Sequence, residues 1–290
     1  MNWIIATILM MAVSVVMYSL VRYIKQYPKS TELVPFAMIA LPVPVYAVFV
    51  LFEKSSYRPS LLHALVLIMQ GIVFVYLGNL YALKGIEKAP NTGYSVLISK
   101  IYVVFTTPLS VVLFNSKLSL SSIFAILMIV FFSYFVMIEK RSNRVKKTKE
   151  ENAWIKYTLI AFLCFGGNAL TSKYLLNGGM PIFFRLLFPG IVAGLLYAPK
   201  AIKNFQNIQV SKKPFILLLL AIAVCSILFN FTMQYAFSKS PNVGYVNAAN
   251  VSSTAILAFP SALIFKDPLT RRRALGIIGV LAGTYILFLA

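Results

Sequence analysis

The side chain best placed for solute chemistry is a lysine inside an apolar segment. Lys100 lies eleven residues after Ala89, near the middle of an apolar run over residues 92–113. A cation at that depth of a bilayer costs at least ~2.5 kcal/mol on insertion scales, so it usually faces the interior of a helical bundle or a water-filled cavity. We therefore predict that Lys100 faces a cavity and attracts an anionic or carboxylate-bearing solute. The alternative is that its flexible stem carries the ammonium group toward the lipid headgroups.

Polar side chains recur at helical spacing in this segment and in a later one. The first stripe is Ser95, Ser99, Tyr102 and Thr106, and the second is Asn247, Asn250 and Thr254. Steps of three and four residues place side chains along one face of a helix. We expect Ser99, Tyr102 and the two asparagines to contact a solute. The alternative is that these groups hydrogen-bond neighbouring helices, which is the favoured role for serine and threonine.

Four more polar residues in apolar segments are candidates for the same solute path. They are Asn79, Asn230, Gln234 and Arg185. Amides offer both donors and acceptors to a solute, and an arginine offers a second cation. Asn79 and Asn230 occupy equivalent positions in the two halves of the chain, so they could equally form a structural clamp inherited by both halves.

Carboxylates are missing from the middle of the apolar segments. All seven lie in loops or at segment ends: Glu32, Glu53, Glu87, Glu139, Glu150, Glu151 and Asp267. Proton-coupled exporters of cationic drugs typically need an acid inside the membrane. An enzyme needs convergent acid, base or metal-binding groups. The sequence therefore disfavours both classes, and we predict no catalytic residue, no metal and no cofactor.

The elements that carry these residues are predicted to be membrane-spanning helices. The chain is 60% hydrophobic and has a mean hydropathy of +0.83, far outside the range of soluble domains. Apolar runs long enough to cross a bilayer lie near residues 3–21, 34–52, 61–83, 92–113, 120–138, 154–176, 181–198, 214–237, 242–265 and 272–289. This pattern predicts an all-α, multi-pass protein of the plasma or inner membrane. Because residues 1–20 are apolar almost from the start, we expect this segment to remain as a helix rather than to be cleaved as a signal peptide.

The two halves of the chain are related by a tandem duplication. The segment Pro90–Tyr94 (PNTGY) returns 151 residues later as Pro241–Tyr245 (PNVGY), and the same offset links the only two tryptophans. Each copy holds five predicted spans, the first over residues 1–138 and the second over 154–290. With an odd number of spans, the second copy enters the membrane from the opposite side. The repeats are therefore predicted to be inverted, which is the architecture of many secondary transporters.

The net charge of +20 comes from 27 lysines and arginines against seven acidic residues. Because the basic residues lie mainly between apolar segments, we expect anionic lipid headgroups at the basic loops as their partner, and no nucleic-acid binding. A basic linker over residues 139–153 separates the repeats. The positive-inside rule places this linker in the cytoplasm and both termini outside.

One stretch of the second half resembles a known family. Residues 247–260, the turn Phe265–Thr270 and the glycines Gly276, Gly279 and Gly283 resemble the end of an EamA repeat of the drug/metabolite transporter (DMT) superfamily. The resemblance implies ten helices in two five-helix repeats over essentially the whole chain. Many relatives are thought to have cytoplasmic termini, which conflicts with the charge pattern.

Three positions relate the chain to this family pattern. Arg185 matches an arginine often found at the start of the second helix of such repeats, but its first-half equivalent is Val34. Asp267 stands where the family usually has glutamate. These departures argue against a symmetrical role for the two copies.

Together these observations predict a secondary transporter. Such a permease would move a small polar or anionic metabolite, for example an amino acid, by alternating access. The alternatives are a multidrug or cation exporter of the same superfamily, an integral membrane enzyme and a channel. The three glycines near the end of the chain are expected to support close helix packing, and could also support a homodimer.

Overall fold

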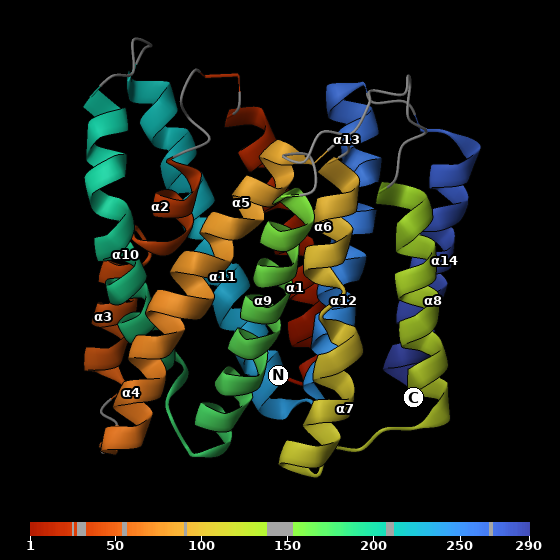
Figure 1. Cartoon of the computed structure of the whole chain (residues 1–290), viewed down its shortest axis with the longest axis horizontal. Coiled ribbons are helices and arrows are strands. Elements are labelled where there is room, and N and C mark those ends of the chain that lie inside the picture. The colour runs from red at the N-terminus through yellow and green to blue at the C-terminus, as the bar shows by residue number, and fades with distance from the viewer. Residues whose placement is uncertain are drawn as a thin grey trace. The chain divides into compact units, whose positions relative to one another are not determined.

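The described part of the chain is built from helices. The computed structural model describes residues 1–24, 26–27, 33–53, 57–89, 92–137, 153–206, 212–266 and 269–290, and every regular element in these ranges is helical (Figure 1). The predicted linker is therefore outside the described residues except for Ala153.

Ten helices in the described ranges are long and apolar enough to cross a membrane, which confirms the predicted all-α, multi-pass membrane protein. We number them as spans 1 to 10: Trp3–Ile24, Val34–Phe52, Leu61–Lys88, Tyr94–Phe114, Leu120–Met137, Ala153–Asn177, Ile182–Gln206, Lys213–Lys239, Val243–Phe265 and Arg271–Leu289.

Six spans are single helices and four are divided. The single helices are α1 (Trp3–Ile24), α8 (Leu120–Met137), α9 (Ala153–Asn177), α10 (Ile182–Gln206), α11 (Lys212–Lys239) and α14 (Arg271–Leu289). Span 2 consists of α2 (Val34–Ile39) and α3 (Val43–Phe52), and span 3 of α4 (Leu61–Met69), the π-helix η2 (Gln70–Leu77) and α5 (Gly78–Lys88). Span 4 consists of α6 (Thr92–Lys100) and α7 (Val103–Phe114), and span 9 of α12 (Val243–Ile256) and α13 (Ala258–Phe265).

Proline accounts for two of these divisions. A proline has no N–H to donate to the carbonyl four residues earlier, and its ring collides with that carbonyl. Pro260 stands four residues after Ile256, the last residue of α12. Pro42 and Pro44 fall at the junction of α2 and α3. The division of span 4 has no proline at its junction.

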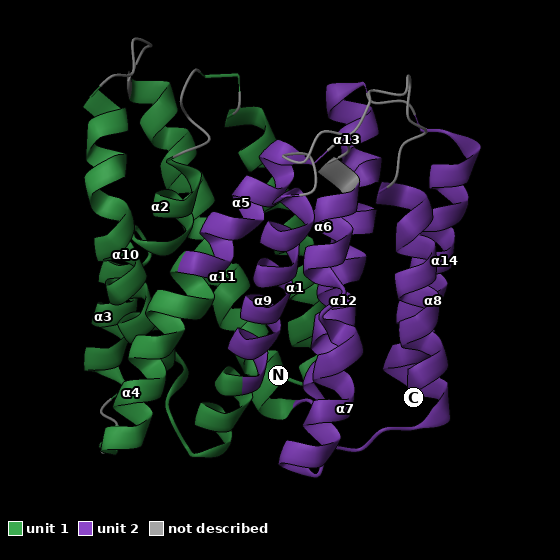
Figure 2. Cartoon of the chain, in the orientation of Figure 1, with its two compact units in different colours: residues 1–76, 171–239 green, residues 77–170, 240–290 purple. Residues whose placement is uncertain are grey.

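The chain forms two compact units, which Figure 2 shows in different colours. Unit 1 comprises residues 1–76 and 171–239, and unit 2 comprises residues 77–170 and 240–290. Each unit draws residues from both sequence repeats. The packing units therefore do not coincide with the repeats.

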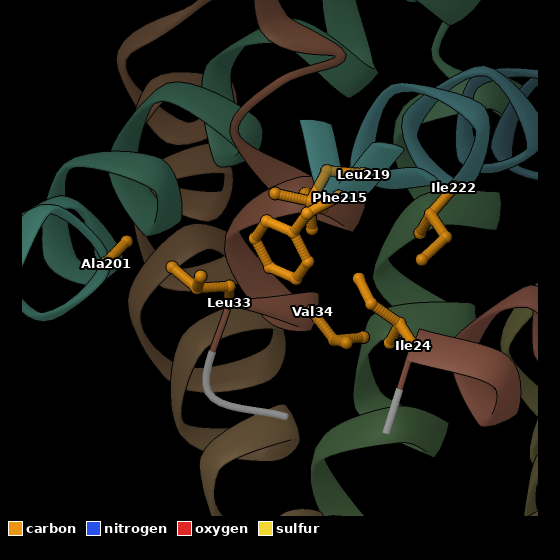
Figure 3. Close-up of a cluster of buried hydrophobic side chains, with 8 residues drawn as sticks. Ile24, Leu33, Val34, Ala201, Phe215, Leu219 and Ile222 are labelled. Carbon is orange, nitrogen blue, oxygen red and sulfur yellow. The ribbon is translucent and has the colours of Figure 1, made fainter. Parts of the chain in front are cut away.

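Unit 1 is assembled around two sets of helix contacts. Helix α1 packs along α11, and α10 packs against α2, α3 and α4. Part of its apolar core is drawn in Figure 3, where Ile24, Val34, Phe215 and Ile222 gather from α1, α2 and α11. The side chains of Ile24, Phe215 and Ile222 are completely buried.

Unit 2 is assembled around one helix from each repeat, α8 from the first and α14 from the second. Helices α8 and α14 run side by side, and α12 packs against α7, α8 and α14 (Figure 1). The three glycines of α14 face α8. A Cβ atom at Gly279 would lie 2.2 Å from the ring of Phe132, and one at Gly276 would lie 2.6 Å from Val136. The glycine ridge thus serves close packing within the chain, as expected, and this face is not available for a homodimer.

Three pairs of spans that are equivalent in the two repeats pack on each other in opposite directions. On spans 5 and 10, Gly276 lies against Val136, whereas Gly283 lies against Ile129. Spans 2 and 7 show the same reversal, because Gly194 lies against Ala40 and the ring of Phe183 stacks on that of Phe49 at a centroid distance of 4.5 Å. Spans 4 and 9 are also antiparallel, as their polar contacts show below.

Candidate solute-binding site

A row of polar side chains joins spans 4 and 9 inside unit 2. Lys100 Nζ donates to Thr254 Oγ1 at 2.6 Å. One turn along α12, Asn250 Nδ2 donates to the Tyr102 hydroxyl at 3.3 Å. Further along, Asn247 Nδ2 donates to Thr106 Oγ1 at 2.9 Å. We call these six residues the polar seam.

The polar seam is centred on the point where span 4 is divided. Helix α6 ends at Lys100 and α7 begins at Val103. Between them the chain tightens, because the N–H groups of Val104 and Phe105 bond to carbonyls only three residues earlier. The cation therefore lies at the junction of two half-helices, and Tyr102 follows it there.

Burial is unequal along the polar seam. Tyr102, Thr106, Asn247 and Asn250 are all buried, whereas Lys100 and Thr254 are only partly buried. Within the described ranges, Oδ1 of Asn247 and Oδ1 of Asn250 have no hydrogen-bond partner. A buried acceptor left without a donor typically costs about 1–3 kcal/mol. Two acceptors in the polar seam are thus open to an additional donor.

The serines of span 4 do not join the polar seam. Ser99 Oγ donates to the carbonyl of Val96 in its own helix at 3.0 Å. Ser95 Oγ lies 2.8 Å from Thr158 Oγ1 on α9. The predicted single stripe is therefore divided, because the helix breaks between Ser99 and Thr106 and the continuous helical spacing is lost there.

The segment Pro241–Tyr245 anchors the start of α12 on α7. Asn242 caps α12 by accepting from the N–H of Gly244 at 2.8 Å, and its Nδ2 donates to the carbonyl of Thr107 at 3.3 Å. A Cβ atom at position 244 would lie 2.0 Å from Thr107 Oγ1. Glycine is therefore required here by the closeness of the two helices, and this approach brings the polar seam residues into contact.

A second polar group lies in unit 1 around Arg185. Its guanidinium donates to Ser172 Oγ. When the Gln70 amide is oriented with Oε1 toward this cation, Oε1 accepts from Arg185 at 3.3 Å and from Thr171 Oγ1 at 2.6 Å. This orientation is required because a guanidinium only donates hydrogen bonds. We call Gln70, Thr171, Ser172 and Arg185 the arginine cluster.

Two more of the predicted residues lie on α11 in unit 1. Asn230 donates to the carbonyl and the hydroxyl of Ser226 at 2.8 and 3.0 Å. The buried hydroxyl of Tyr46 lies near both Asn230 and Arg185. Gln234, four residues beyond Asn230, is 2% exposed, and its Oε1 has no partner within the part of the chain that the structure describes.

The structure thus divides the nine predicted residues between the units. Lys100, Ser99, Tyr102, Asn79, Asn247 and Asn250 belong to unit 2, and Arg185, Asn230 and Gln234 belong to unit 1. The equivalent asparagines at 79 and 230 therefore have different surroundings. The sequence did not single out Thr171, Ser172 and Tyr46 as candidates. A hydroxyl pair in an apolar span was the available signal for Thr171 and Ser172, and Tyr46 is one of 16 tyrosines with no distinguishing neighbour.

Comparison with known proteins identifies part of the chain directly. Residues 152–289 match the model of the EamA-like transporter family. This half of the chain is similar to that family. The match confirms the resemblance seen in the sequence, and the matched residues include the Asn247, Asn250 and Thr254 side of the polar seam.

The fold of the chain has also been seen experimentally. A solved structure, titled "Crystal structure of protein", has a TM-score of 0.80 to this chain at 11% sequence identity, over 99% of this chain and 96% of the other. At that identity the likeness establishes the fold alone. A search of curated proteins found no match.

Proposed function

We propose that this protein is a secondary transporter that moves a small polar or anionic metabolite by alternating access. One observation carries the proposal: a divided span and its repeat equivalent meet through a row of polar side chains that includes a membrane-embedded lysine. Divided helices at the interface of two repeats are where secondary transporters bind their substrates and coupling ions.

The antiparallel packing of equivalent spans supports an inverted repeat. Spans 2 and 7, 4 and 9, and 5 and 10 occupy equivalent places in the two sequence copies, and each pair runs in opposite directions. A copy inserted from the other side of the membrane would produce this reversal. Two gates of similar construction, one for each side, are what alternating access requires.

The chemistry of the polar seam favours a solute with a carboxylate and a nitrogen donor. Lys100 can bind the carboxylate, and the open Oδ1 of Asn250 can accept from an ammonium group. Thr254 and Asn250 are four residues apart, which is about 6 Å along a helix. An α-amino acid with one hydrogen bond at each end covers that separation. Asn79 and Ser99, in the same unit as the polar seam, are proposed as further contacts of this solute. Arg185, Asn230 and Gln234 are proposed as solute-binding residues of unit 1.

Uptake into proteoliposomes tests this function. The wild-type protein is supplied in parallel with amino acids, carboxylates, sugars and cationic drugs. We expect amino-acid or carboxylate uptake, and we expect Lys100→Met to weaken it by about 10- to 100-fold, the effect of losing a hydrogen bond to a charged group. Lys239→Met removes an exposed lysine at the end of α11 and should transport normally.

Two results would contradict the proposal. Undiminished uptake by a folded Lys100→Met protein would show that Lys100 does not contact the solute. Transport of cationic drugs and of no other tested solute would show that the substrate is a cationic drug rather than an anionic metabolite. Size-exclusion chromatography of each variant in detergent separates a loss of transport from a loss of folding.

A further inference from the structure

Two lysines and two tyrosines form a compact group in unit 2 that the proposed transport path does not use. The rings of Tyr81 on α5 and Tyr157 on α9 stack at a centroid distance of 5.6 Å and an angle of 22°. Lys84 Nζ lies 5.5 Å from the centre of the Tyr81 ring and 5.9 Å from that of Tyr157. Lys88 Nζ lies 5.7 Å from the Tyr157 ring. We call these four residues the lysine–tyrosine platform.

The lysine–tyrosine platform lies at the ends of two spans. Span 3 ends at Lys88 and span 6 begins at Ala153, so both ammonium groups lie within about two turns of the end of an apolar helix. Trp154 and Tyr94 pair beside it at a centroid distance of 6.5 Å. Tryptophan and tyrosine gather at the level of the headgroups in membrane proteins. The platform is therefore at the depth of lipid phosphates.

The charge around the lysine–tyrosine platform is positive. Lys156, next to Tyr157, is exposed and adds a third cation, and Glu87 is an exposed acid between the two platform lysines in the sequence. In the described part of α5, Glu87 forms no ion pair with Lys84 or Lys88. The ammonium groups are held over aromatic rings instead, an interaction that supports a cation without neutralising it.

The duplication supplies an internal comparison. The positions equivalent to Tyr81, Lys84 and Lys88 are Thr232, Tyr235 and Lys239, and the position equivalent to Tyr157 is Ala6. The group of equivalent positions therefore retains one of the two lysines and has neither tyrosine at the tyrosine positions. The complete lysine–tyrosine platform is therefore present at only one of the two equivalent places in the described repeats.

We propose that the lysine–tyrosine platform binds the phosphate of an anionic phospholipid headgroup. Lys84 and Lys88 are one turn apart on the same face of α5, so both ammonium groups can donate to one phosphate. The tyrosine rings fix the lysine stems in this geometry, and the acyl chains lie in the bilayer beside the apolar part of span 3. The inference is independent of which solute the protein transports.

The test uses the full chain purified in detergent and a titration of its thermal stability. The probes are phosphatidylglycerol, phosphatidylcholine and inorganic phosphate. A basic residue near an anionic membrane surface contributes about 5-fold to binding, so Lys88→Met should weaken the phosphatidylglycerol affinity by about 5-fold and Lys84→Met/Lys88→Met by about 30-fold. Lys239→Met, the change at the equivalent position, should leave that affinity unaltered. Phosphatidylcholine and inorganic phosphate should each stabilise the wild-type protein less than phosphatidylglycerol does.

Three outcomes overturn the proposal. An equal loss in Lys239→Met and Lys88→Met would show a general charge effect. A shift with inorganic phosphate as large as that with phosphatidylglycerol would show a site for a free anion. Equal affinity for phosphatidylcholine would show that the anionic charge is not recognised. Lys88 is exposed, so its replacement leaves the fold intact and each outcome remains readable.

Discussion

Asn247 and Thr106 connect two spans, 9 and 4, that hold the same place in the two sequence repeats. Asn247 Nδ2 donates to Thr106 Oγ1 at 2.9 Å, and both side chains are completely buried. The contact joins spans 4 and 9 at the polar seam, so its strength can be measured separately from transport.

A double-mutant cycle on this pair should yield a small coupling energy. We expect Asn247→Ala to lower the free energy of unfolding by about 0.5–1.5 kcal/mol, since one hydrogen bond is lost. With Thr106→Ala added, the coupling should be about 0.6 kcal/mol, a typical value between membrane helices. Denaturant unfolding in detergent measures both quantities. Strictly additive single effects would show that the two side chains do not interact.

Gly244→Ala should destabilise the protein. The added Cβ would lie 2.0 Å from Thr107 Oγ1 and 2.9 Å from the Cα atom of Thr107, so α12 must move away from α7. Such overpacking costs about 1–3 kcal/mol. Gly190→Ala is the control, because its nearest neighbour is the Val43 side chain at 3.1 Å. A melting temperature for Gly244→Ala equal to that of the control would refute the close approach.

Gly279→Ala should affect stability without changing the oligomeric state. The new methyl group would lie 2.2 Å from the Phe132 ring on α8 within the same chain. We expect a loss of about 1–3 kcal/mol, partly recovered by Phe132→Leu in the double variant. Thermal unfolding and light scattering measure the two effects. A change in the molar mass of the particle, with stability unaltered, would place this ridge in a contact between two chains.

Ser172→Ala should weaken the arginine cluster. Arg185 donates to the Ser172 hydroxyl, and both residues are buried. Removing an acceptor from a charged donor costs about 1.5–3 kcal/mol. Ser121→Ala, at an exposed position on α8, should stay within about 0.5 kcal/mol of wild type. Equal melting temperatures for the two variants would mean that Ser172 contributes nothing to holding the arginine.

The spans were predictable because each is a continuous apolar run of the length that a bilayer requires. The divisions at Pro42 and Pro260 follow from proline's missing N–H. The division after Lys100 did not follow from any residue type, since Ile101 and Tyr102 are compatible with a helix. The position of this division depends on how α6 and α7 pack against other helices, and the local sequence does not determine that packing.

The candidate site was predictable in its residues but not in its pairings. The spacing of Asn247, Asn250 and Thr254 placed them on one face, and the structure sets that face against span 4. Ser99 has the same spacing as its neighbours, yet it bonds to its own helix. Helical periodicity identifies which side chains share a face of one helix. The hydrogen-bond partner of each side chain depends on the register between two packed helices. Whether these residues bind a solute stays a prediction.

The interleaving of the two repeats has a consequence for biosynthesis. Helix α1 ends at Ile24, but its packing partner α11 begins at Lys212, and α8 likewise awaits α14. When the first repeat has been synthesised, five spans are in the membrane, and four of them, spans 1, 2, 4 and 5, have their main packing partners in the part of the chain that is still untranslated. The early spans must therefore remain soluble in lipid as separate helices until the second repeat arrives. A gene cut within the linker should yield two fragments that are degraded when made singly and that form the native particle when made together.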